Sequence, residues 1–353
     1  RLGRSHGHRR RLRELQLVPL RGSARVVCEV QPRAPVVRKI KRGFFCRGDY
    51  VNDRFGGGRC DGFHLRARSA MIDASFSARR CSDLFFGHRC IVQHVDVKVH
   101  GNLATILMDR AAVRNALNPQ LIESLSTALS DVHQEKRVRA VVLAASGEHF
   151  CSGIDLRVLS AIAEMPEDEA LAQWYSAWQH LTELYEQMLR FPKPIVAAVD
   201  GSAVGAGLGL ALAADLIVAS TRASFSAVAV RRGLVGGATA ALLAFRYGSA
   251  LAARLALTGE AIDANEAYRL GMCGKPVVPE QIWVAAGELA GQCALAPREA
   301  VQATKRLLNE AIGEALLTQL SAGAADSATA CTTEAASEGI RAYLESRDPK
   351  GPA

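Results

Sequence analysis

Residues 200–215 read DGSAVGAGLGLALAAD and directly follow an apolar run at residues 195–199. An uninterrupted apolar run of this length is typical of a strand buried on both faces. The glycines then open a helix rich in alanine and leucine, so the segment predicts a strand, a tight turn and a buried helix. Such a turn directs bare backbone N–H groups, at the positive end of a helix dipole, toward an anionic atom.

Acidic and imidazole side chains are missing from this part of the chain. Asp200 and Asp215 bound the glycine-rich segment, and no Asp, Glu or His lies between them. Residues 216–259 contain none either. The segment therefore predicts a site that stabilises an oxyanion but lacks the acid and base side chains that proton transfer requires.

Alternating strand and helix patterns predict an α/β fold from about residue 92 onward. Residues 94–108 are expected to form two strands joined by a His-Gly-Asn turn, and Asn118 is expected to cap a helix that begins at Pro119 and runs to about residue 136. A long helix is predicted at 166–191, and further strands at 140–144, 195–199, 216–220, 225–230 and 275–278. Residues 286–353 read as helices and are expected to pack as an annex or at a subunit interface.

Residues 1–91 are expected to form a separate, irregular leader. Residues 1–90 contain 19 Arg and 2 Lys against 7 acidic residues, whereas the net charge of the whole chain is +8, so the remainder is acidic. An Arg-rich, acid-poor leader is typical of an organelle transit peptide. The alternative is upstream sequence before a natural start at Met71, and the two are compatible. A nucleic-acid-binding arm is disfavoured because aromatic residues do not alternate with the basic ones.

Cysteine spacing and hydropathy argue against three further classes. The chain has 9 cysteines, but those after the leader are isolated and show no CxxC or other metal-ligand spacing. Neither a disulfide framework nor a metal centre is therefore expected. No apolar run reaches the roughly 18–20 residues that a membrane span requires, so no membrane span is expected.

A second glycine turn, SGIDL at residues 152–156, also lies between a predicted buried strand and a helix. Two such turns on neighbouring strands can each supply one N–H to a single oxygen, which is the geometry that stabilises a thioester enolate. The alternative for either turn is a tight packing connection without chemistry. A dinucleotide-binding turn is excluded, because Gly205, Gly207 and Gly209 have the spacing GxGxG and not GxGxxG.

Several sequence blocks together resemble the enoyl-CoA hydratase/isomerase, or crotonase, superfamily. They are RNALN (114–118), FCSGIDL (150–156), PKPIVAAVDGSAVGAG (192–207), LTGEAIDANEAYRLGM (257–272) and SEGIRAYLESRDP (337–349). The resemblance covers about residues 94–350, and its spacing is closest to the dienoyl-CoA isomerase branch. It implies an α/β, crotonase-like spiral of ββα units, with residues 92–285 as the spiral core and residues 286–353 as a C-terminal helical trimerisation region.

The same resemblance implies a biological setting. Its members bind acyl-CoA thioesters, and coenzyme A enters as part of the substrate, so no further cofactor is expected. They assemble as homotrimers, often paired into hexamers. The implied activity is that of an enoyl-CoA hydratase or isomerase of fatty-acid oxidation. Together with the leader it predicts a mitochondrial location, with cytoplasmic and peroxisomal locations as alternatives.

The resemblance also assigns site residues. The backbone N–H groups of Ser152 and Ala206 are expected to form the oxyanion hole, although Ala206 stands where the family usually has glycine. Lys305, with Arg306 beside it, and Arg114 are expected near the CoA phosphates, or alternatively as solvated charges. Asp155 is expected to hold its own turn. The full set of expected substrate-binding positions is Arg114, Ser152, Gly153, Ile154, Asp155, Leu156, Gly207 and Lys305.

The catalytic carboxylates of the family are absent. The resemblance places them at Gly209 and Ala229 in hydratases, and at about Gly237 in dienoyl isomerases. Replacement acid or base groups must come from elsewhere in the chain. The candidates lie beside the first turn and on or before the long helix, and each has an alternative as a core, loop or surface residue: His149, Cys151, Glu164, Tyr175, His180 and Glu183.

Two classes of function follow. The first is an enzyme that polarises an acyl-CoA thioester, either an enoyl-CoA hydratase or isomerase or, given the missing carboxylates, a divergent acyl-CoA hydrolase or decarboxylase. The second is a catalytically inactive acyl-CoA-binding or assembly subunit. Turnover of crotonyl-CoA or of a 3,5-dienoyl-CoA separates the two.

Overall fold

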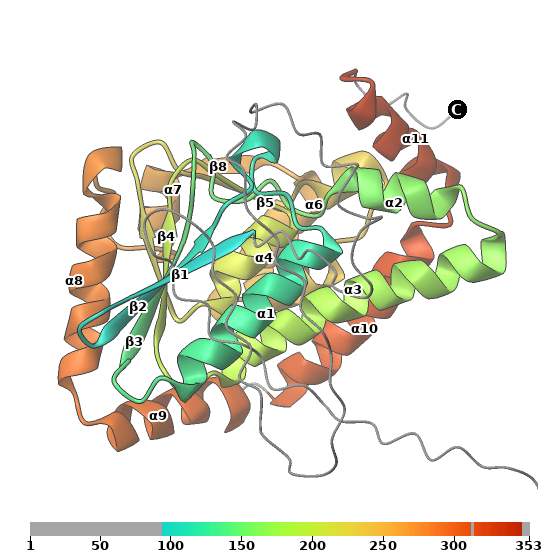
Figure 1. Ribbon diagram of the computed structural model, residues 1–353. Helices are drawn as coiled ribbons and strands as arrows, with labels where there is room; N and C mark the ends of the chain where they lie inside the picture. The colour runs from blue at the N-terminus through green and yellow to red at the C-terminus, as the bar shows by residue number, and fades with distance from the viewer. Residues whose placement is uncertain (1–93, 312–313, 348–353) are drawn as a thin grey trace, which may run out of the picture. The chain divides into compact units, whose positions relative to one another are not determined.

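The computed structural model describes residues 94–311 and 314–347. The expectations for the leader, residues 1–91, lie outside the described residues. The described part is a mixed α/β structure built on two sheets, as the alternation of strand and helix patterns predicts (Figure 1).

Five strands form the larger sheet. β1 and β2 are antiparallel and joined by the expected turn, whereas β2, β3, β4 and β6 run parallel to one another. In spatial order the strands are β1 (Val95–His100), β2 (Leu103–Met108), β3 (Ala140–Ala145), β4 (Ile195–Val199) and β6 (Leu216–Ala219). The strands predicted at 94–108, 140–144, 195–199 and 216–220 are therefore confirmed.

Three short strands form the smaller sheet, in the order β5 (Ser202–Val204), β7 (Ser224–Ser226) and β8 (Ala261–Asp263). The chain steps from the larger sheet to the smaller one after β4 and again after β6. After β3 it makes a similar step, because Cys151 forms a single parallel bridge to Ala203 of β5. Parallel strands share the edge at which they end, so these connections, and the glycine turns within them, gather at one edge.

Two of the predicted strands are wrong. Of the strand predicted at 225–230, only the first residues belong to β7, and the chain continues as a 3-10 helix, η3 (Val228–Arg232). Gly233, at a φ of +67°, closes this turn by donating its N–H to the Val230 carbonyl, so the segment folds back on itself and does not pair. The strand predicted at 275–278 is reduced to one bridge, between Val277 and Ser220.

Helices cover both faces of the larger sheet (Figure 1). α8 (Ile282–Leu295) packs on one face through Ile282, Ala286, Ala290 and Ala294, which recur every four residues. On the other side the core is completed by α1 (Pro119–Gln134), α3 (Glu167–Arg190) and α4 (Ala206–Ala213). Because both faces are covered, β3 and β4 are apolar along their length and show no alternation.

Local chemistry sets the ends of α1 as predicted. The Asn118 side chain accepts a hydrogen bond from the Leu121 N–H at 2.9 Å, and Pro119 occupies the first helical position. At the other end the buried ammonium of Lys193 donates to the carbonyls of Val132 and Glu135, at 2.6 and 2.9 Å. These carbonyls have no partner inside the helix, so Lys193 satisfies them from a neighbouring segment.

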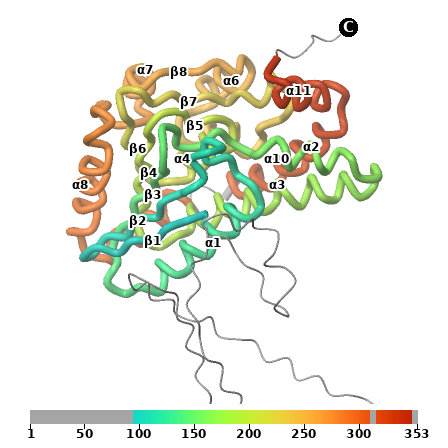
Figure 2. Tube along the Cα trace, turned by 45° about the horizontal axis from the view of Figure 1, so that its top comes forward, coloured from blue at the N-terminus to red at the C-terminus, as the bar shows by residue number. Residues whose placement is uncertain are grey.

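The remaining helices come from residues 156–344. α10 (Glu314–Ala330) packs against α3 and α5 (Gly237–Tyr247), and α11 (Glu334–Leu344) packs against α2 (Leu156–Ala163) and η3 (Figure 2). The boundary predicted between residues 285 and 286 falls inside α8. Within the described ranges no helix is both long and apolar enough to cross a membrane. The other helices are α6 (Ser249–Thr258), α7 (Ala264–Arg269) and α9 (Arg298–Arg306), with 3-10 turns at Ala111–Val113 and Pro279–Gln281 and a π-helical turn at Leu307–Ala311.

Candidate active site

A cavity of about 160 Å³ lies where the glycine turns meet. Its wall comes from the 152–156 loop, the turn between β5 and α4, the segment from η3 into α5, and side chains of α3, α10 and α11. Among the described residues that line it, none is Asp or Glu. The cavity is therefore enclosed by both predicted turns, and its wall lacks carboxylates.

The two glycine turns are in direct contact. Cys151 donates its N–H to the Ser202 carbonyl at 3.0 Å, and Val204 donates its N–H to the Cys151 carbonyl at 2.9 Å. A Cβ added at Gly207 would lie 2.3 Å from that same carbonyl, so only glycine fits there. Gly207 thus brings α4 against the first turn and does not itself line the cavity, which corrects the expectation that it contacts substrate.

Gly153 sets the approach of the first turn to α4. Its φ is +93°, a conformation that L side chains rarely adopt. A Cβ at this position would lie 2.7 Å from the Val204 carbonyl oxygen and 3.4 Å from the Ala206 nitrogen. The backbone of the first turn therefore runs beside the N-terminus of α4, where the Ala206 N–H emerges.

One of the two expected oxyanion donors is wrong. The Ser152 N–H donates to the Arg114 carbonyl at 2.9 Å and is therefore occupied. In the same turn the Gly153 carbonyl accepts the Leu117 N–H, and the Asp155 N–H donates to the Leu117 carbonyl, both at 2.8 Å. The N–H of Ile154, between them, has no acceptor among the described residues, and Ile154 lines the cavity. Extended residues direct successive N–H groups to opposite sides, so pairing at 153 and 155 turns the Ile154 N–H away from Leu117.

The second expected donor, the backbone N–H of Ala206, does lie at the cavity. Ala206 is the first residue of α4 and lines the cavity, so its N–H has no acceptor within the helix. The Gly205 carbonyl, which belongs to the same peptide group, accepts the Thr239 hydroxyl at 3.2 Å and the Gly209 N–H at 3.0 Å. These bonds orient that peptide group and polarise its N–H toward the cavity.

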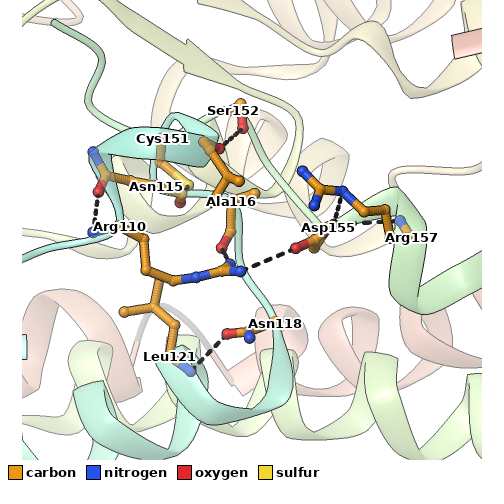
Figure 3. A network of polar contacts seen from close by, with 10 residues as sticks. Arg110, Asn115, Ala116, Asn118, Leu121, Cys151, Ser152, Asp155 and Arg157 are labelled. Carbon is orange, nitrogen blue, oxygen red and sulfur yellow. Dashed lines mark hydrogen bonds and ion pairs between the residues drawn. The ribbon is translucent and has the colours of Figure 1, made fainter. Parts of the chain in front are cut away.

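Asp155 holds the first turn (Figure 3), and it is not among the residues that line the cavity. Its buried carboxylate accepts the Arg157 N–H at the start of α2 and pairs with the Arg110 guanidinium, both at 3.3 Å. Arg110 also donates to the Ala116 carbonyl, and Asn115 ties the same loop to the carbonyls of residues 146 and 149. The structural role expected for Asp155 is confirmed, and the expected contact with substrate is not supported by its position.

Lys305 is buried and does not line the cavity, contrary to the expectation that it contacts CoA. Its ammonium donates to the Asp215 carboxylate at 2.7 Å and to the carbonyls of Met188 and Lys193 at 3.1 and 3.2 Å. Burial lowers the pKa of Lys305, and the Asp215 charge opposes this shift. Lys305 therefore fastens α9 to the ends of α3 and α4, while its exposed neighbour Arg306 is left to solvent.

Packing closes two of the three positions where the family has carboxylates. A Cβ at Gly209 would lie 2.5 Å from the Tyr185 hydroxyl oxygen, and one at Gly237 would lie 2.6 Å from the backbone of Gly323 in α10. Of the three positions, only Ala229 and Gly237 line the cavity. At Gly209 and Gly237 neighbouring atoms fill the space that a carboxylate side chain would occupy, so neither position can accept one without a shift of its surroundings.

The sequence candidates for acid or base separate clearly. Glu164, Tyr175, His180 and Glu183 are exposed and do not line the cavity. Cys151 is fully buried, its thiol donates to the Asn115 carbonyl, and burial raises its pKa to about 12, so it is a core residue. His149 does line the cavity, and its Nδ1 atom is buried without a hydrogen-bond partner. Of these candidates, only His149 is brought to the site.

Several cavity residues have no signal in local sequence motifs. Thr182 of α3 lines the cavity, and its hydroxyl is buried without a hydrogen-bond partner. Tyr185, one turn further along α3, donates its hydroxyl to the Ala206 carbonyl at 2.6 Å and so fixes the start of α4. Arg232 and Tyr343 line it from η3 and α11. The helical spacing of Trp178, Thr182 and Tyr185 places them on one buried face, but only the packing of α3 on α4 shows what that face meets.

Comparisons with known proteins agree with one another. Residues 98–351 match the family model described as enoyl-CoA hydratase/isomerase. A Thermus thermophilus protein named "Putative enoyl-CoA hydratase" is 34% identical over 250 residues, covering 71% of this chain and 97% of that protein. The Escherichia coli 1,2-epoxyphenylacetyl-CoA isomerase is 29% identical over 261 residues, covering 74% of this chain and 97% of that protein.

A solved structure shows the same fold. An enoyl-CoA hydratase from Mycobacterium avium matches with a TM-score of 0.64 at 28% identity, covering 72% of this chain and 98% of that one. This likeness confirms the predicted spiral of strand–strand–helix units followed by C-terminal helices. The trimerisation role of those helices stays a prediction.

Proposed function

Because the chain belongs to the enoyl-CoA hydratase/isomerase family, we propose that it binds an acyl-CoA thioester and polarises its carbonyl oxygen with the N–H groups of Ile154 and Ala206. One observation carries this proposal. Both N–H groups belong to the wall of one cavity, and neither has an acceptor among the described residues. Two donors aimed at one oxygen stabilise the enolate that forms when charge moves onto a thioester carbonyl, and each donor is worth about 3 kcal/mol.

Proton transfer at carbon needs a further group, and we assign it to His149. Histidine is the side chain that ordinarily exchanges protons near neutral pH. The Nδ1 atom of His149 is buried at the cavity without a partner, which is costly for a polar atom unless a ligand or a reacting proton meets it. The Asn115 amide donates to the His149 carbonyl at 2.8 Å and so fixes the backbone from which the imidazole projects.

A second function is favoured by a different observation. The described cavity wall has no carboxylate, and packing fills the space for one at Gly209 and Gly237. A protein with this wall can bind an acyl-CoA without turning it over, as a scaffold or assembly subunit. Three further predictions rest on the family resemblance and the leader alone, and they accompany the first proposal: a role in fatty-acid oxidation, a trimeric or hexameric state and a mitochondrial location.

The experiment measures binding and turnover separately. Acyl-CoA binding to the full chain is measured by calorimetry, and turnover is measured on crotonyl-CoA and on a 3,5-dienoyl-CoA. We expect binding, and turnover that falls about a hundredfold in His149→Gln without a change in Kd. His180→Gln, on the exposed face of α3, is the matched control and should behave as wild type.

Three outcomes are informative. Absence of acyl-CoA binding would overturn the proposal as a whole. Binding without turnover on either thioester would support the non-catalytic function. Turnover that survives His149→Gln would remove His149 from the mechanism while leaving the oxyanion donors in place.

A further inference from the structure

Arg232 is a charged side chain in the cavity wall that lacks a charged partner. Its guanidinium is half-buried and lies 4.1 Å from the centroid of the Tyr343 ring. It forms no hydrogen bond or ion pair within the described ranges, whereas Arg222, for example, pairs with Asp200 at 2.6 Å. Because no carboxylate lines this cavity in the described part of the chain, the wall offers Arg232 no counter-charge.

This position is unfavourable for a cation. Burial lowers the pKa of Arg232 below its ordinary value, the Tyr343 side chain opposes that shift, and the Arg114 charge adds to it. The guanidinium nevertheless stays protonated in the physiological range, as arginine does in proteins. A half-buried cation of this kind is stabilised when a ligand brings an anion to it.

The contact with Tyr343 leaves the N–H donors of Arg232 available to such an anion. The ring lies against the guanidinium, with Cζ 4.1 Å from its centroid, and it supplies no anionic acceptor for the N–H groups. A planar carboxylate accepts two parallel hydrogen bonds from one edge of a guanidinium. The arrangement therefore matches a carboxylate better than it matches a neutral acyl chain.

Arg232 lies on the wall that continues from the oxyanion turn. η3 ends at Arg232 and directly follows β7, whose Ser226 carbonyl accepts the Gly205 N–H at 2.8 Å. The other cavity arginine, Arg114, is exposed and lies on the loop whose carbonyl accepts the Ser152 N–H. We infer that Arg232 binds a carboxylate on the acyl part of the substrate, while Arg114 is left for the CoA end.

The cavity volume suits a short acyl group. A void of about 150 Å³ holds a benzene-sized group, and this cavity measures about 160 Å³. The substrate class is therefore a CoA monothioester of a short dicarboxylic acid. This inference rests on the proposed acyl-CoA binding and adds the charge of the acyl group to it.

The test compares two thioesters of equal chain length that end in a carboxylate or in a methyl group, with free CoA as the reference. Kd values of the full chain are measured by calorimetry for succinyl-CoA, butyryl-CoA and free CoA. Wild type should bind succinyl-CoA about tenfold to a hundredfold more tightly than butyryl-CoA, as expected for hydrogen bonds between charged groups. Arg232→Met keeps an apolar stem against Tyr343 and should abolish that preference without changing the Kd of butyryl-CoA or CoA. Arg232→Lys, which cannot form the bidentate bond, should retain only part of it.

The neighbouring Arg231 provides the matched control. It is exposed and donates to the Thr258 carbonyl at 2.8 Å, so Arg231→Met should keep the preference for succinyl-CoA. Equal binding of succinyl-CoA and butyryl-CoA by wild type would overturn the inference. Equal weakening of all three ligands in Arg232→Met would assign Arg232 to the CoA phosphates and would also overturn it. If no thioester binds, the proposed function itself fails. Equal binding of succinyl-CoA and butyryl-CoA overturns only the inference, so the two failures are distinguishable.

Discussion

Replacing Lys305 by Met tests whether this lysine serves the fold or the ligand. The family resemblance expects Lys305 near a CoA phosphate, whereas the structure buries it against Asp215. Methionine keeps most of the side-chain volume and removes the charge. The substitution therefore isolates the electrostatic role, because it leaves little cavity behind.

The expected magnitude follows from the contacts that are lost. Lys305 gives up an ion pair of 2.7 Å and two hydrogen bonds to backbone carbonyls, and removal of one partner of a buried ion pair costs about 3–5 kcal/mol. Asp215 keeps two donors, the Ile195 N–H at 2.8 Å and the Asn309 amide at 3.3 Å. We therefore expect a loss near the lower limit, about 3 kcal/mol in the free energy of unfolding, or roughly 6–12 °C in Tm for a domain of this size.

The assay is urea denaturation followed by acyl-CoA calorimetry on the same preparation. Lys305→Met should lower the midpoint of unfolding and leave the Kd for acyl-CoA unchanged. Arg306→Met, one residue further on and exposed, should change the free energy of unfolding by less than about 0.5 kcal/mol. Full stability of Lys305→Met combined with weaker acyl-CoA binding would refute the reasoning and restore the phosphate contact.

Three further predictions concern the site and its supports. Tyr185→Phe removes a buried hydrogen bond of 2.6 Å at the start of α4 and should cost about 1–3 kcal/mol in urea denaturation, against less than about 1 kcal/mol for Tyr247→Phe, whose bond is 3.3 Å long and half-buried. Gly153→Ala strains a residue at a φ of +93° and places a Cβ 2.7 Å from a backbone oxygen. The variant should remain folded in urea denaturation at low denaturant, while calorimetry should show that it no longer binds acyl-CoA. Burial raises the pKa of Asp200, but hydrogen bonds and the charge of Arg222 outweigh burial and hold it below its ordinary value of 3.8. The unfolded state then binds the proton more readily, so Asp200 stabilises the fold above about pH 3.8 and loses this effect as the pH falls further. The stability difference between wild type and Asp200→Asn should therefore be largest near neutral pH and shrink in acid; a difference that grows in acid would contradict the sign.

The elements predicted correctly are those whose signals lie within a few neighbouring residues. The run at 195–199 is apolar throughout, and Asn118 and Pro119 mark the start of α1 by capping chemistry that involves only the next turn. The strand predicted at 225–230 is wrong because the turn that Gly233 closes overrides the alternation of the residues before it. Periodicity therefore identifies elements reliably where no competing turn interrupts it.

The sequence by itself determined the α/β class, the two glycine turns and the absence of carboxylates, since each of these is a property of contiguous residues. Only the tertiary structure decided which N–H groups face the cavity. Ser152 and Ile154 look equivalent in the motif, and the difference between them depends on pairing with the separate loop of Arg114 and Leu117.

The same holds for the charged residues. Lys305 and Arg306 are adjacent in the chain, but Lys305 is buried by an ion pair to a residue 90 positions away while Arg306 is exposed. Arg232 belongs to no recognisable sequence motif. It is a candidate anion-binding residue only because η3 and α11 place it and Tyr343 together in the cavity wall. Burial and hydrogen-bond partners come from segments distant in sequence, and so the role of each charge was settled by packing.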